Sequence, residues 1–509
     1  MGGYYSNSGP LPDDATTEKT IVGRIVEHAR RQPEASALVH RGAHVSYAEL
    51  GQLALSVAKR LCDSGVTDGD RVLLSASSTP AFVVCYLAVH LSGAVAVPVD
   101  AGMSAQRIAF IRDRVTAKLQ VTPPEQDACL QEAREGLSLD SQRDLSWVGP
   151  RSEDLADIMF TSGTTGAPKG VMLSHRNLGT GASQINRVLG TERDDVEVLA
   201  LPLAHSFGLG SLRCLLSQGA CAVLVEGFAF PVQIFDAMDR YCATGFRCVP
   251  SGLATMFRVS GDKLGEFAST LRYVELGSAR MPLTDKERLM RLLPRTRLFM
   301  HYGLTEATRS VFIDFHRDSE RLDSIGKPAP GVDLKIVGER GSDPPGRGVG
   351  EICIKGGHVM DGYWDDSEQT AKVLDGGWLH TGDSGYMGDD GYLYLVGRRD
   401  DLINVGGRKV SPVEVEDALR THDAVADCAC VGIADPQGLS GEAVAMLIVP
   451  ESGREPSEKE LRGYLRDLLE PYKLPSQWLV GGRIPYTHNG KVQRHVVREK
   501  FTTIGREQI

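Results

Sequence analysis

Apolar and polar positions alternate along the chain in two ways, one typical of helices and the other of strands. Residues 21–31 have the spacing of an amphipathic helix, and a second helix is predicted after Ser46, an N-cap with Glu49 three residues on. The predicted strands cover 71–74, 94–99, 197–201, 220–225, 273–276 and 297–300, and further predicted helices cover 80–91, 208–217, 231–241 and 284–293. Because such alternation is typical of parallel sheets covered by helices, we predict an α/β fold.

The character of the sequence changes at about residue 333. From there to residue 399 the predicted strands are short and glycines are frequent, as in 346–354, which predicts a β-rich subdomain. Beyond it, helices at 413–419 and 457–469 and strands at 425–432 and 444–449 predict a compact α+β domain. We therefore expect a disordered tail at 1–19, a large N-terminal domain of helix-covered sheets at 20–399, and a smaller C-terminal domain at 400–509.

Composition and charge narrow the classes of function. The chain has 509 residues, 42% of them hydrophobic, and its formal net charge is −10. A surface of that sign repels polyanions, so no nucleic-acid partner is expected. The ten cysteines show neither a disulfide framework nor metal-ligand spacing, which favours a reducing cytoplasm. The polar N-terminus lacks the apolar core of a signal peptide, and no apolar run is as long as a membrane span.

One loop stands out by its residue types. Residues 161–170 read Thr-Ser-Gly-Thr-Thr-Gly-Ala-Pro-Lys-Gly and lie between apolar segments at 155–160 and 170–175, so we predict a turn between two strands. Hydroxyls, glycines and one lysine can bring N–H groups, side-chain oxygens and a cation close to a polyphosphate. The loop lacks the GxxxxGK[ST] spacing of the common NTPase phosphate loop. On composition alone, a flexible surface loop is the alternative.

This decapeptide closely resembles the phosphate-loop motif of the adenylate-forming superfamily, which holds acyl-CoA synthetases, peptide-synthetase adenylation domains and beetle luciferases. Further segments resemble the other motifs of the superfamily in the same order, and together they span nearly the whole chain. They are 200–208, 275–280, 301–306, 380–385, 397–416 and 484–494. The resemblance implies that the C-terminal domain is mobile and rotates between two half-reactions.

The resemblance also implies a role for each matching residue. Thr305 would contact the α-phosphate, while Glu306 and Thr165 would hold Mg²⁺, which prefers one or two carboxylates plus phosphate oxygens. The implied catalytic residues are Lys491, Thr305, Glu306, Lys169 and His205. The implied nucleotide-binding residues are Thr161, Ser162, Gly163, Thr164, Thr165, Gly166, Lys169, Ser278, Ala279, Arg280, Tyr302, Gly303, Thr305, Asp383, Arg398 and Lys491. The implied acyl-pocket residues are His205, Phe207, Gly208, Gly277, Ser278 and Gly303.

The interdomain segment carries two further implied roles. Asp400 falls at the hinge position, and Gly406 and Gly407 match the strand beside the pantetheine arm of coenzyme A, where glycine permits a close approach. Arg280 departs from the superfamily, whose members often have an uncharged residue there. A solvated surface position is the alternative for Arg280, while Arg280 and Arg309 are also candidates to serve a second polar group of the substrate.

The reaction implied by the resemblance uses ATP, Mg²⁺, coenzyme A and a small carboxylic acid. The carboxylate would attack the α-phosphate of ATP, giving an acyl-adenylate and pyrophosphate, and the thiol of coenzyme A would then accept the acyl group. Three alternatives stay open. The thiol could belong to the phosphopantetheine of a carrier protein, the chain could be a catalytically silent nucleotide-binding regulator, or it could be a luciferase-like oxygenase.

Overall fold

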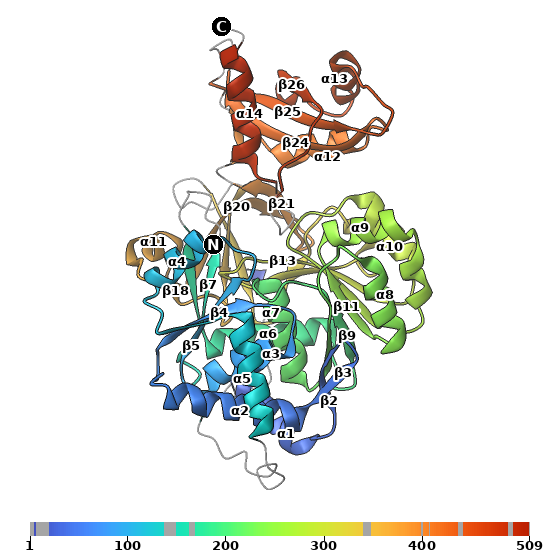
Figure 1. Ribbon diagram of the computed structural model, residues 1–509. Coiled ribbons are helices and arrows are strands. Elements are labelled where there is room, and N and C mark those ends of the chain that lie inside the picture. The colour runs from blue at the N-terminus through green and yellow to red at the C-terminus, as the bar shows by residue number, and fades with distance from the viewer. Residues whose placement is uncertain are drawn as a thin grey trace.

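The computed structural model describes residues 5–6, 20–136, 149–161, 168–338, 348–398, 401–406, 408–435, 441–486 and 492–507. Figure 1 shows a large N-terminal lobe and, above it, a smaller lobe formed by the C-terminal residues. The smaller lobe rests over the end of the large lobe where β20 and β21 emerge (Figure 1). The predicted division into a large α/β part and a small C-terminal part is therefore confirmed at the level of architecture.

One sheet of the large lobe contains the two strands that flank the predicted phosphate loop. Its order is β18 (Gly362–Tyr363), β8 (Lys169–Ser174), β7 (Leu155–Thr161), β5 (Val95–Asp100), β4 (Arg71–Ala76) and β6 (Leu119–Val121). Strands β7, β5, β4 and β6 pair in parallel, whereas β8 is antiparallel to both of its neighbours. The antiparallel pair β7–β8 confirms the predicted strand–turn–strand arrangement.

A second sheet forms the other half of the large lobe. Its order is β15 (Lys327–Pro328), β14 (Val311–Asp314), β13 (Arg297–Tyr302), β12 (Tyr273–Leu276), β11 (Gly245–Cys248), β9 (Val196–Leu199), β10 (Cys221–Leu224), β2 (Ser36–His40) and β3 (Ala43–Ser46). The strands from β13 to β2 are all parallel. Since ligands bind beyond the carboxyl ends of parallel strands, the segments after β9, β12 and β13 lie where a substrate is expected.

Helices cover these sheets and form the common core. Their bounds are α1 (Ile21–Arg31), α2 (Tyr47–Asp63), α3 (Pro80–Leu91), α4 (Ala105–Arg114), α5 (Pro123–Glu135), α6 (His175–Leu189), α7 (Ser206–Gln218), α8 (Pro231–Arg240), α9 (Pro250–Ser260) and α10 (Leu283–Leu292). Helix α3 is apolar on every side and is buried from Ala81 to Leu91, as expected of a helix packed all round. Helices α6 and α7 pack against each other beneath the candidate site.

The β-rich part of the large lobe forms a third, antiparallel sheet. It contains β1 (Tyr5–Ser6), β16 (Asp333–Val337), β17 (Gly350–Lys355), β20 (Trp378–Met387), β19 (Leu374–Asp375) and β21 (Leu393–Arg398), with helix α11 (Ser367–Val373) beside it. The prediction of a wholly disordered N-terminal tail was wrong for Tyr5 and Ser6, because these two residues pair with Leu334 and Asp333 of β16. Backbone pairing to a sheet edge depends little on residue type, so the polar composition of the tail did not indicate it.

The small lobe is the predicted α+β unit. A hairpin of β22 (Ile403–Val405) and β23 (Arg408–Val410) precedes a sheet in the order β24 (Val425–Ala434), β25 (Glu442–Pro450) and β26 (Gln477–Val480). Helices α12 (Pro412–Arg420), α13 (Glu458–Arg466) and α14 (Arg494–Glu507) pack on this sheet around two apolar clusters. In the described parts of the chain, no helix has the length and apolarity that a bilayer crossing requires.

Candidate active site

The ends of the phosphate-loop strands lie beside an aromatic ring. Thr161 at the end of β7 is opposite Lys169 at the start of β8, so the loop between them joins two paired strands. Ser162, Gly163, Thr164, Thr165 and Gly166 lie outside the described residues. The Nζ atom of Lys169 lies 5.3 Å from the ring centroid of Tyr363, which belongs to the neighbouring strand β18. A cation at this distance from an aromatic face is attracted by the ring quadrupole.

The same tyrosine contacts the residue expected to hold Mg²⁺. The Oη atom of Tyr363 donates a hydrogen bond of 2.9 Å to Oε1 of Glu306, and the backbone N–H of Met360 donates to the carbonyl oxygen of Glu306 at 2.8 Å. Burial and the Glu306 carboxylate raise the pKa of Tyr363, so its hydroxyl stays a donor. Lys169 therefore lies over the ring of Tyr363, and Glu306 lies at its hydroxyl. The motif comparison did not identify Tyr363, because only strand pairing places it there.

A second group joins three of the residues expected to bind the nucleotide. Tyr302, at the end of β13, donates a hydrogen bond of 2.6 Å to Oδ2 of Asp383 on β20. Nε of Arg398 lies 3.0 Å from Oδ1 of the same carboxylate, since β20 and β21 place Asp383 and Arg398 opposite each other. Burial and Asp383 raise the pKa of Tyr302 well above its usual range. Three predicted nucleotide residues, far apart in sequence, thus form one hydrogen-bonded group.

The turn that carries Asp383 is held by Glu351 of β17. The backbone N–H of Gly382 donates to Oε1 of Glu351 at 3.0 Å, and Nδ1 of His380 lies 3.1 Å from Oε2. Gly382 has φ of +72°, a left-handed conformation that favours glycine. Glu351 therefore fixes the position of Asp383 without being part of the motif itself. The sequence motifs did not identify Glu351, because only the pairing of β17 with β20 brings it to the turn that carries Asp383.

The predicted acyl residues, except Gly277, line a cavity of about 100 Å³ that is open to solvent. Its lining includes His205, Phe207, Gly208, Ser278 and Gly303, which were predicted, and His301, Thr305, Thr308 and Arg309. His205 is the N-cap residue of α7, and Ser278, after β12, has φ of +74°. Such left-handed backbone in a residue other than glycine is often found at ligand sites.

Gly277 lies behind the cavity wall rather than in it. A Cβ atom at Gly277 would come within 2.0 Å of Cε1 of His301, so the imidazole ring packs directly on the glycine backbone. Gly277 was expected to line the acyl pocket, but the space beside its backbone is taken by the His301 ring. In the site, Thr305 and Ser206 share a hydrogen bond of 3.3 Å between their hydroxyls, which links the 301–306 segment to the start of α7.

A buried network of charges lies under the cavity. Nε of Arg247 contacts Glu275 at 2.6 Å, and its Nη1 contacts Glu197 at 2.9 Å. Glu275 also receives Nε of Arg309 at 2.7 Å and lies 2.7 Å from Nδ1 of His301. Burial disfavours the Glu275 carboxylate, but Arg309 and His301 outweigh burial and hold its pKa well below the usual range. For Glu197 burial dominates and raises the pKa to about 7.

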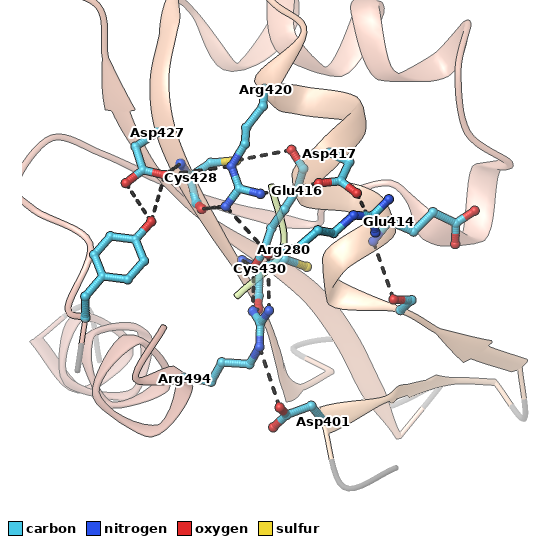
Figure 2. A network of polar contacts seen from close by, with 12 residues as sticks. Arg280, Asp401, Glu414, Glu416, Asp417, Arg420, Asp427, Cys428, Cys430 and Arg494 are labelled. Carbon is cyan, nitrogen blue, oxygen red and sulfur yellow. Dashed lines mark hydrogen bonds and ion pairs between the residues drawn. The ribbon is translucent and has the colours of Figure 1, made fainter. Parts of the chain in front are cut away.

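Arg280 connects the two domains. Its Nη1 atom lies 2.6 Å from Oδ2 of Asp417 on α12, so a residue expected beside the nucleotide is paired with the C-terminal domain (Figure 2). The same turn of α12 carries Glu416, which binds Arg494 at the start of α14 with a hydrogen bond of 3.1 Å. Nε of Arg494 also lies 3.7 Å from Asp401 (Figure 2). These contacts tie the segment after Lys491 to the segment after the expected hinge.

Three of the expected C-terminal residues, Asp400, Gly407 and Lys491, lie outside the described residues. Gly406 ends the β22 arm of its hairpin with φ of +58°. On either side of Lys491, Tyr486 and Val492 form an antiparallel bridge. Tyr486 also donates a hydrogen bond of 2.8 Å to Asp427, within the C-terminal domain.

Taken together, the large α/β lobe, the small C-terminal lobe and the grouping of Tyr302, Asp383 and Arg398 are the features expected of a nucleotide-activating enzyme of two domains. Residues 25–364 match the family model described as AMP-binding enzyme, and residues 414–491 match the AMP-binding enzyme C-terminal domain. The chain belongs to the AMP-binding enzyme family. The predicted superfamily membership is confirmed.

The relatives and a structural neighbour agree with this assignment. Oxalate–CoA ligase of Arabidopsis thaliana is 31% identical, covering 95% of this chain and 98% of its own. Feruloyl-CoA synthase of an Amycolatopsis species is 32% identical over 94% of this chain and 98% of its own. The crystal structure of ATP-bound MatB from Rhodopseudomonas palustris superposes with a TM-score of 0.86 at 27% identity, covering 96% of this chain and all of that one.

Proposed function

We propose that this enzyme activates a carboxylic acid with ATP, releases pyrophosphate, and transfers the acyl group to coenzyme A with release of AMP. Family membership and CoA-ligase relatives support the reaction type. The observation that carries the proposal is the meeting of two groups of residues at the 301–306 segment. Tyr302 binds Asp383 and Glu306 binds Tyr363 on the nucleotide side, while Gly303 and Thr305 line the acyl cavity.

In the first step a carboxylate oxygen bonds to the α-phosphorus of ATP, and the bond from phosphorus to pyrophosphate breaks. Two anions must approach each other, so catalysis depends on positive charge and alignment. Lys169 lies at the end of the phosphate loop, and we assign Lys491 to the carboxylate and α-phosphate. The Glu306 carboxylate is suited to hold Mg²⁺, which when bound would neutralise phosphate charge. Tyr363 orients that carboxylate through its hydroxyl.

In the second step the thiol sulfur bonds to the acyl carbon, the bond from that carbon to the AMP oxygen breaks, and AMP leaves. We assign the pantetheine approach to Gly406 and Gly407, and the rotation that brings them in to a hinge at Asp400. The ion pair of Arg280 with Asp417 supports a stable interdomain arrangement that this rotation must break. All ten cysteines are free thiols, which supports a reducing compartment such as the cytoplasm.

The test is acid-dependent exchange of labelled pyrophosphate into ATP, followed by a thioester assay with free coenzyme A. The relatives act on acids as different as oxalate and ferulate, so the acid panel should include short dicarboxylates and aromatic acids. Exchange with at least one acid and thioester formation with coenzyme A are the expected results. Thioester formation only with a phosphopantetheinylated carrier protein would favour the carrier alternative. Absence of exchange with every acid would overturn the proposal.

A further inference from the structure

Arg309 is fixed on one side of its guanidinium and open on the other. Nε donates to Glu275 at 2.7 Å, while Nη2 donates to the carbonyl oxygen of Phe207 at 3.1 Å and to Oγ of Ser211 at 2.7 Å. The side chain is fully buried, and the Arg309 backbone is left-handed with φ of +46°. These bonds hold the guanidinium in one orientation, so it is preorganised rather than adaptable.

The remaining nitrogen, Nη1, has no hydrogen-bond partner among the described residues. It lies over the backbone of Gly210 on α7, where a Cβ atom would come within 2.8 Å of it. Most buried polar atoms in proteins are paired, and a charged donor left unpaired is costly. A buried donor of this kind, held in place by its neighbours, is a position where a ligand acceptor is expected.

The location of Arg309 connects this donor to the substrate. Arg309 lines the acyl cavity and also lines a smaller, more enclosed cavity between α6 and α7. The two cavities share Ser206, Thr305, Thr308 and Arg309, so these residues form the boundary between them. The inner cavity is lined on its far side by apolar residues of α6, including Leu178 and Ala182. Arg309 therefore belongs to the part of the acyl-cavity wall that borders the inner cavity.

The surrounding charges allow an acceptor at this place. Arg309 and Arg247 face Glu275 and Glu197 in the buried network. Glu275 stays ionised because its pKa is held low, whereas burial raises the pKa of Glu197 to about 7. Two guanidiniums face two carboxylates, so the network has no net negative charge even when both carboxylates are ionised. It does not repel an anionic or neutral oxygen that approaches Nη1.

We propose that the acid activated by this enzyme carries an oxygen acceptor at the end remote from the reacting carboxylate, and that Arg309 binds this acceptor through Nη1. The substrate class is then a short dicarboxylic or terminally oxygenated acid, rather than an acid with a plain hydrocarbon end. This inference rests on the proposed acid activation. It makes Arg309 a specificity-determining residue, with no part in bond making or breaking.

The experiment measures pyrophosphate exchange for straight-chain acids of three to six carbons, each with a methyl, hydroxymethyl or carboxylate end. At the best chain length, the oxygenated acids should exceed the methyl-ended acid in kcat/KM by on the order of tenfold to a hundredfold, because a buried charged donor is otherwise left unpaired. The carboxylate and hydroxymethyl series show whether the acceptor is an anion or a hydroxyl. Equal or better exchange with the methyl-ended acids would overturn the inference while leaving the proposed function intact.

Variants separate recognition from a structural role. Arg309→Met should abolish the preference for oxygenated acids, so that oxygenated and methyl-ended acids of one chain length have similar kcat/KM values. If Arg309→Met does not fold, Gly210→Ala provides a second test, because its methyl group would come within 2.8 Å of Nη1 and displace that nitrogen or an acceptor bound to it. Ser211→Ala is the matched control, since it removes a partner of Nη2 only and should keep the preference. A preference unchanged in the folded Arg309 or Gly210 variant would refute the assignment.

Discussion

The ion pair between Arg280 and Asp417 offers a direct test of whether the domain arrangement in the structure takes part in the reaction. The side chains are 49% and 32% exposed, and their charged atoms lie 2.6 Å apart. Partly exposed pairs of this kind contribute about 0.5–1 kcal/mol. Arg280→Ala should therefore reduce the population of this arrangement, relative to the others, by about two- to fivefold, given an RT of about 0.6 kcal/mol.

The assay measures the two half-reactions separately, as pyrophosphate exchange and as thioester formation from supplied acyl-adenylate. If each half-reaction uses its own domain arrangement, as proposed above, the ratio of their rates should change by the same two- to fivefold in Arg280→Ala. Asp417→Ala should change the ratio in the same direction, although it also removes a contact of 3.4 Å with Arg420 inside α12. Adding Arg280→Ala to Asp417→Ala should change the ratio little, since both variants already lack the Arg280–Asp417 pair. In about 1 M salt, the rate ratios of Arg280→Ala and the unmodified enzyme should differ less, because the Debye length falls to about 3 Å and the ion pair is screened.

Arg321→Ala is the matched control for this prediction. Arg321 pairs with Asp390 at 2.7 Å, with side chains 41% and 37% exposed, but both residues belong to the large lobe. Its removal should leave the ratio of the half-reactions unchanged. The reasoning is refuted if Arg280→Ala and Arg321→Ala behave alike, or if the effects of Arg280→Ala and Asp417→Ala simply add.

Three further predictions concern single side chains. Tyr363→Phe keeps the ring beside Lys169 but removes the hydroxyl from Glu306, so pyrophosphate exchange should fall about tenfold or more while thioester formation from acyl-adenylate persists; unchanged exchange would contradict this. Burial lowers the pKa of His358 from 6.5 to about 4, so the folded protein loses stability as pH falls below 6.5, by about 2 kcal/mol at pH 5. In His358→Gln, urea unfolding at pH 7 and pH 5 should show a correspondingly smaller loss, and an equal loss in both proteins would show that another group is responsible. Lys491→Ala should abolish pyrophosphate exchange and spare thioester formation from supplied acyl-adenylate. Equal loss of both activities would show that Lys491 does not act in the first step alone.

Local patterns in the sequence predicted helices α1, α2, α3, α7, α8, α10, α12 and α13 and the long apolar strands, whereas α4, α5, α6, α9, α11 and α14 were not among the predicted elements. The predicted helices at 21–31 and 80–91 have the bounds of α1 and α3, because each begins after a threonine whose side chain caps it, Thr20 and Thr79. The apolar runs at 273–276 and 297–300 became neighbouring parallel strands. Periodicity and capping act over a few residues, so a single chain displays them fully. The order of the motifs likewise sufficed to indicate the family.

Contacts between distant positions were decided by the tertiary structure alone. Tyr363 reaches Glu306 and Lys169 because the short strand β18 pairs with β8, in a sheet other than the β-rich one expected for that segment. The open donor of Arg309 exists because Glu275, on a neighbouring strand, takes the other side of its guanidinium. Strand order and the packing of helices on sheets determine which distant side chains meet, and the local pattern of apolar and polar residues predicts neither of them. The sequence therefore determined the class of chemistry, and the fold determined which side chains position it.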